Sequence, residues 1–269
     1  MTETLQRVST ACFGLSYLLA FVIELARVRW PSGTLRTVGL ILGGAGILAH
    51  SIFLAVRHPT PATAYGGTLA VAWVLAVFYL YGALHHRRQA WAIFVLPIIL
   101  ALVGLSIFAV SASDPLEFDS TRVWGALHGI LVLLAAVGVC VGCVASAMYL
   151  IQARRLRLKQ SPFGGVKMLS LERLELMNRR AVNVAFPLLT LGLLLGAVLL
   201  RQYHDIADNW LSLKVIGTVG LWVVFAVLLY LRYSAHVPGR RLAWGTIAAF
   251  ILMLAVLVAA HPFVREGSP

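Results

Sequence analysis

Long runs of apolar residues are the feature that most limits how this chain can fold. The eight runs lie at about residues 9–26, 37–56, 65–84, 90–111, 124–151, 182–200, 211–231 and 242–260. Most approach or exceed the roughly 20 residues that a helix needs to cross a bilayer, where backbone groups must be satisfied within the helix. Of the 269 residues, 60% are hydrophobic, against about 45–50% in soluble domains. We predict an all-α polytopic membrane helical bundle of about eight transmembrane helices, as one integral membrane domain over residues 1–269.

Positively charged residues are distributed unevenly among the connections between these runs. Lys and Arg accumulate in cytoplasmic connections, whereas Asp and Glu have little influence. With the N-terminus outside, the outward segments keep only six of the 22 cations, namely Arg7, Arg57, Arg122, Arg201, Lys214 and Arg265. We therefore expect both termini to face outward and the first run to be an uncleaved helix. The net charge of +12 then indicates orientation in the lipid bilayer, and no nucleic acid partner is expected.

The segment 152–181 combines many basic residues with large apolar ones. The apolar members are Leu169, Leu171, Leu174, Leu176 and Met177. This combination predicts a basic amphipathic cytoplasmic linker that lies on the anionic inner leaflet. The linker could also dock a cytoplasmic partner.

Three histidines interrupt or end very apolar runs, and the predicted topology places all three toward the outer face. His50 lies in the outer part of the second run, His128 about one turn below the outer surface, and His261 at the end of the last run. A histidine within a span is costly unless it finds a partner, so each is a functional candidate. The alternative is a hydrogen bond to a neighbouring helix. The remaining histidines lie in connections, where solvated interfacial residues are ordinary.

His128 and His261 end different helices at the same face, so they could approach one iron atom from opposite sides. Imidazole is a common axial ligand of haem, whereas a zinc site needs three or four nitrogen or sulfur ligands. The spans contain no such cluster of ligands. We therefore interpret the two histidines as a candidate axial pair for haem iron. Cys140 and Cys143 form a C-x-x-C that no histidine follows, so helix packing explains them better than covalent haem attachment.

The second half of the chain carries the most specific motif. Residues 124–156 read WGALHGILVLLAAVGVCVGCVASAMYLIQARRL, and a later helix reads AFPLLTLG from Ala185 to Gly192. The first half agrees more loosely, with ILAHSIFLAVRHPTP from Ile47 to Pro61. Over roughly residues 40–262 the chain resembles the cytochrome c assembly family, whose haem-handling members are helical membrane bundles.

The resemblance implies roles for the same histidines. His128 and His261 match the family's two outer histidines that ligate haem iron, and His50 matches a histidine within a span proposed to hold haem on its way outward. The implied cofactor is haem b, and the implied partners are haem and other cytochrome c assembly subunits or an apocytochrome. The implied location is the bacterial plasma (inner) membrane, as a multi-pass protein.

The chain departs from the family between the sixth and seventh runs. Larger members have a tryptophan-rich haem segment there, whereas this chain has RQYHDIADNWLSLK at residues 201–214. That shorter segment resembles the smaller inner-membrane subfamily, whose members are named for cytochrome c assembly or for influence on haem biosynthesis. Trp210 and Trp124 could stack on a haem, and Arg122, Arg201 or Lys214 could pair with its propionates. Both tryptophans could instead belong to the aromatic belt.

Two classes of function follow from these observations. One is a haem-binding protein that handles or delivers haem at the outer face, where its task is positioning and no catalytic residue is needed. The other is a membrane regulator or scaffold that stabilises a haem-biosynthesis enzyme or another partner without binding haem. A transporter is a weaker third class, because no pair of interrupted spans occurs at matching positions of two halves.

Overall fold

The computed structural model describes residues 9–59, 64–85, 91–108, 121–159, 169–202, 213–235 and 237–259. Every regular element within these ranges is an α-helix. The helices are α2 (Thr10–Arg29), α3 (Gly33–Arg57), α4 (Ala64–His85), α5 (Trp91–Phe108), α6 (Thr121–Arg157), α7 (Leu171–Gln202), α8 (Leu213–Tyr233) and α9 (Gly239–Ala259). The predicted all-α bundle is confirmed.

Seven of the described helices are long and apolar enough to cross a membrane, and α5 is a shorter apolar helix. α5 has 18 residues and contains Pro97. At about 1.5 Å per residue it is about 27 Å long, close to the thickness of the hydrocarbon core. The chain is therefore a multi-pass membrane protein.

Two helices extend well beyond the apolar runs that predict them. α6 has 37 residues and α7 has 32. Hydropathy marks only the part of a helix that lies in lipid, whereas internal hydrogen bonds let the helix continue into water. Residues 152–157 and 171–181 of the predicted linker consequently belong to α6 and α7, and Leu174 is fully buried in the core.

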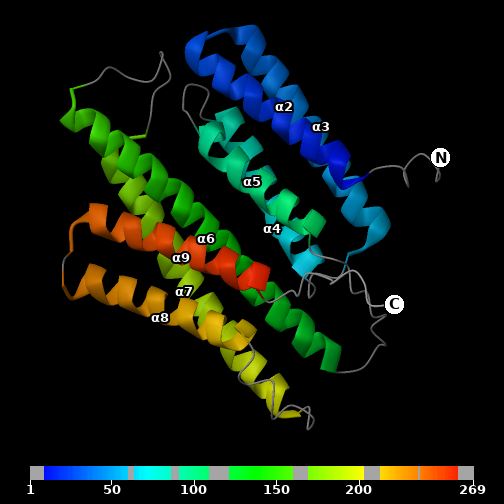
Figure 1. The fold of residues 1–269 in the computed structure, drawn as a ribbon, viewed down its shortest axis with the longest axis vertical. Coiled ribbons are helices and arrows are strands. Elements are labelled where there is room, and N and C mark those ends of the chain that lie inside the picture. Colours follow the sequence, from blue (N-terminus) through cyan, green and yellow to red (C-terminus); the bar gives the residue numbers. More distant parts are fainter. Residues whose placement is uncertain are drawn as a thin grey trace, which may run out of the picture.

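The helices form two groups that lie side by side (Figure 1). α2 to α5 make one group and α6 to α9 the other. Within the groups, α2 packs on α3 and α5, α4 on α5, α6 on α7 and α9, and α8 on α9. α6 also contacts α4 and α5, so it joins the two groups.

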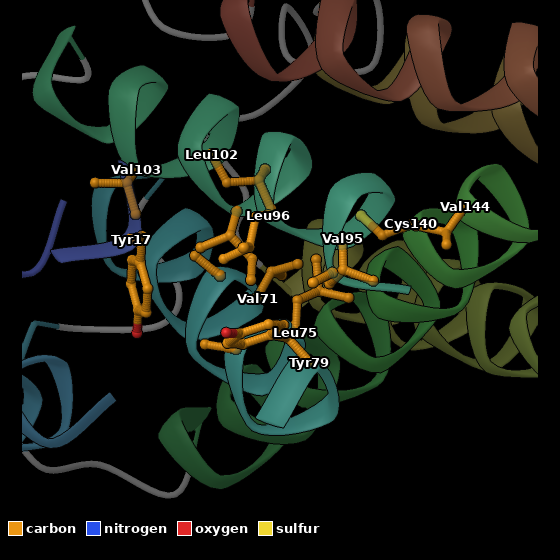
Figure 2. Close-up of a cluster of buried hydrophobic side chains, with 14 of the residues drawn as sticks. Tyr17, Val71, Leu75, Tyr79, Val95, Leu96, Leu102, Val103, Cys140 and Val144 are labelled. Carbon is orange, nitrogen blue, oxygen red and sulfur yellow. The ribbon is translucent and has the colours of Figure 1, made fainter. Parts of the chain in front are cut away.

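A buried apolar cluster holds α2 to α5 together and extends to α6 (Figure 2). α4 and α5 contribute much of it, including Leu75, Tyr79 and Leu96, while Cys140 and Val144 reach it from α6. Cys140 and Cys143 are free and buried, which agrees with the packing role expected for them. A second cluster, including Ala185, Leu189 and Phe225, holds α6 to α9 together.

Candidate functional site

His128 lies on α6 and its imidazole ring faces α7. Its Nδ1 is 2.7 Å from the carbonyl oxygen of Gly192. A carbonyl oxygen can only accept, so Nδ1 carries the hydrogen and donates it. In the neutral ring, Nε2 then holds the free lone pair, and no hydrogen bond to Nε2 occurs among the described residues. A backbone carbonyl that fixes the tautomer in this way is the usual support of a metal-binding histidine.

Two glycines of α7 give the His128 ring its position. A Cβ on Gly196 would be 2.8 Å from Cε1 of His128, and a Cβ on Gly192 would be 3.0 Å from Cγ2 of Val132. Positions four apart lie on one helix face. Gly192 and Gly196 therefore let α6 approach closely enough for the ring to reach the Gly192 carbonyl.

The opposite face of α7 is held by α8. The ring of Phe186 stacks on Trp222 with 5.6 Å between centroids, and Trp222 Nε1 donates to Thr190 Oγ1 at 2.9 Å. Thr190 and Gly192 are two residues apart and thus point to opposite sides of the helix. The motif from Ala185 to Gly192 consequently anchors α7 to α8 on one side and supports His128 on the other.

His50 occupies a different environment, between α2 and α3. Its ring is fully buried and stacks on Phe13, with 4.1 Å between centroids and 3° between planes. Its Nδ1 is 3.4 Å from the hydroxyl oxygen of Tyr17, while Nε2 is buried without a hydrogen-bond partner among the described residues. Because this Nε2 is buried, an iron atom could reach it only if the surrounding side chains or helices moved. His50 and His128 therefore belong to separate sites.

The other predicted site residues are described only in part. Trp124 lies one turn before His128 on α6, and 56% of its surface is exposed. His261 and Trp210 lie outside the described residues, so the axial pair with His261 stays a prediction. Within the described ranges, no three His, Cys, Asp or Glu side chains are grouped closely enough to hold a metal ion.

Two polar clusters mark the ends of helices where basic residues gather. Glu24 is buried and accepts a hydrogen bond from Arg27 at 3.0 Å, in an i, i+3 ion pair. The second cluster centres on Asn178 of α7, which is also buried. Its amide nitrogen lies within hydrogen-bond distance of Gly142 O, Ser146 Oγ and Thr246 Oγ1, and its oxygen accepts from Arg232.

Residues 62–260 match the sequence profile of the family described as cytochrome C assembly protein. The chain belongs to this family. It is 24% identical to the cytochrome c biogenesis protein CcsA of Prochlorococcus marinus (strain MIT 9312), over 71% of this chain and 69% of that protein. It is 23% identical to CcsA of Guillardia theta, over 70% and 69%, and 24% identical to protein HemX of Bacillus subtilis (strain 168), over 57% and 58%. No solved structure is significantly similar.

The region shared with the family contains His128 and its whole support on α7 and α8. His128 is a candidate from the sequence alone, whereas Thr190, Trp222 and Gly196 gain their roles only from the structure. The glycine spacing from 192 to 196 was the available signal, because small residues four apart on a membrane helix favour close helix contact. No comparable spacing in the sequence indicates that Phe13 and Tyr17 enclose His50.

Proposed function

We propose that this protein binds haem and assists cytochrome c-type biogenesis at the outer face of a bacterial inner membrane. The observation that carries the proposal is the hydrogen bond from His128 Nδ1 to the Gly192 carbonyl. It orients the ring and leaves the Nε2 lone pair for an iron atom. This geometry fits an axial haem ligand, and the names of the relatives support a role in cytochrome c maturation.

In this proposal the chain's residues position haem b and perform no acid–base chemistry. His128 would ligate the iron on one side and His261 on the other. Trp124, exposed on the same helix one turn before His128, would offer stacking area to the porphyrin, with Trp210 as a second candidate. Bound haem supplies the iron porphyrin that an apocytochrome receives. His50, enclosed by Phe13 and Tyr17, would act at another stage of haem handling.

The scaffold alternative has its own structural support. Arg154 and Arg157 at the end of α6, and Arg179 and Arg180 near the start of α7, are exposed. Such cations could dock an acidic partner protein without any haem. The two functions differ in whether His128 is required.

The absorption spectrum of the purified protein tests the haem proposal. We expect wild-type protein from haem-replete cells to show six-coordinate low-spin haem, and His128→Ala and His261→Ala to lose that spectrum. His85→Ala is the matched control, because His85 is exposed and contacts the Tyr81 carbonyl and ring of its own helix. Added imidazole should restore the low-spin spectrum to His128→Ala.

The scaffold function would be favoured by the opposite result. Wild-type protein that is colourless, and stays colourless when haem is added, contradicts haem binding. A His128→Ala spectrum identical to that of the wild type would remove His128 from the site, even if haem is present.

A further inference from the structure

A groove of about 640 Å³ lies between α6 and α9, away from His128. It is called the α6–α9 groove here and is lined by Ala147, Leu150, Ile151, Ala153, Arg154, Arg157, Leu158, Arg240 and Trp244. The end of α6 and the start of α9 lie toward the same end of the molecule (Figure 1). The groove therefore runs along the helices at the end where basic residues gather.

The lining of the groove is apolar at one end and positively charged at the other. On α6 its apolar part comes first, at Ala147, Leu150 and Ile151, and its cations follow at Arg154 and Arg157. From Ala147 to Ile151 the apolar part rises about 6 Å at 1.5 Å per residue, and the two arginines of α6 follow within the next two turns. An apolar stretch with cations at its mouth matches the part of an acyl chain next to its headgroup.

The charge of the groove selects the kind of ligand. Among the described lining residues, the ionisable side chains are those of Arg154, Arg157 and Arg240, and all three are exposed. None of the three forms an ion pair with any other residue that the structure describes. Three unpaired guanidinium groups attract a phosphate, to which arginine donates in a bidentate manner.

The same lining argues against haem as the occupant. Among the described residues that line the groove there is no His, Cys, Met or Tyr side chain that could ligate iron. Trp244 is 58% exposed on α9, one turn after Arg240, as expected of an indole at the level of lipid headgroups. Positive residues also favour the cytoplasmic side, where anionic lipids contact membrane proteins.

We propose that the α6–α9 groove binds one anionic phospholipid, such as phosphatidylglycerol, from the inner leaflet. Arg154, Arg157 and Arg240 hold its phosphate, and an acyl chain lies along Ala147 to Ile151. This site is independent of haem binding at His128. It would fix the end of α6, the helix that joins the two halves of the bundle.

Native mass spectrometry of the full chain in an uncharged detergent tests the site, with phosphatidylglycerol and phosphatidylcholine as probes. We expect the wild type to bind phosphatidylglycerol more tightly than phosphatidylcholine. The double variant Arg154→Gln/Arg157→Gln should weaken phosphatidylglycerol binding about tenfold or more, since each cation near a membrane surface contributes about 1 kcal/mol. Phosphatidylcholine binding should stay unchanged.

The matched control is Arg173→Gln/Arg180→Gln, which removes two exposed cations of α7 outside the groove. It should bind phosphatidylglycerol like the wild type. A second variant, Ala147→Trp, fills the apolar part and keeps every cation, so it should reduce binding of both lipids.

Three results would overturn the proposal. Equal binding of both lipids by the wild type would show that charge does not select the ligand. Equal losses in the two arginine double variants would indicate diffuse attraction rather than a site. Competition by added haem that survives in His128→Ala would assign the groove to haem.

Discussion

The ring of His128 occupies the space that a side chain on residue 196 would need. Its Cε1 would be 2.8 Å from a Cβ there, while Nδ1 is 2.7 Å from the Gly192 carbonyl. One missing methyl group thus sets how close the ring lies to α7. His50 shows the opposite case, because its ring is enclosed by Phe13 and Tyr17 and has no exposed surface. The two residues therefore differ in whether an iron atom can reach Nε2, which makes His128 a candidate ligand and His50 an enclosed histidine.

Gly196→Ala should displace the His128 ring without unfolding α7. Alanine favours a helix by about 1 kcal/mol over glycine, so the helix itself should not weaken. The added methyl group should break the bond to Gly192 and reduce haem content several-fold, measured from the absorption spectrum and haem-to-protein ratio. Gly220→Ala on α8, where a Cβ meets nothing within 4 Å, is the control. Equal haem content in both variants would contradict the positioning role of Gly196.

At the scale of the elements, Asn178 connects α7 to its three neighbours. Its amide lies within hydrogen-bond distance of groups on α6 and α9, and its oxygen accepts from Arg232 of α8 at 2.6 Å. Membrane helices gain little from apolar contact with one another, because lipid tails are equally apolar. A buried amide with several partners therefore specifies which helices meet and at what height.

Asn178→Leu should destabilise the α6 to α9 group by about 2 kcal/mol, since it leaves the buried partners of the amide unsatisfied. The measurement is reversible unfolding in mixed micelles with increasing denaturing detergent. Asn183→Leu on the same helix is the control, because Asn183 is exposed and its one hydrogen bond among the described residues is to the Tyr233 hydroxyl. Asn183→Leu should lower the free energy of unfolding by only about 0.5 kcal/mol. Similar losses in the two variants would show that Asn178 has no special role.

The whole molecule consists of two helix groups that meet through α6. The 37 residues of α6 cross the bundle, and this helix contacts α4 and α5 as well as α7 and α9. Cys140 and Val144 provide the apolar contact with the first group (Figure 2). Because α6 crosses the membrane once, the connections before and after it must lie on opposite sides.

Reporter fusions after Pro115 and after Lys159 test this topology. The first should be active only outside the cytoplasm and the second only inside, as the clustering of Arg154, Arg155 and Arg157 predicts. Two reporters on the same side would contradict the crossing by α6. If the first reporter were active only inside and the second only outside, the fold would be unaffected, but His128 would lie at the cytoplasmic face.

The sequence predicted the helical bundle and indicated that His128 needs a polar partner. These features depend on composition and on the high cost of a polar side chain in lipid. The helix ends were less predictable, since hydropathy does not report where a helix continues into water. α7 therefore begins at Leu171 rather than near residue 182.

By itself, the sequence determined that this chain is a helical membrane protein with a histidine costly enough to need a partner. Only the tertiary structure decided which partners the polar residues find: Gly192 for His128, Tyr17 for His50, and Arg232 for Asn178. Those pairs join residues 33 to 64 positions apart. The physical reason is that hydropathy specifies burial along one helix, whereas partner choice depends on the rotation and height at which two helices pack.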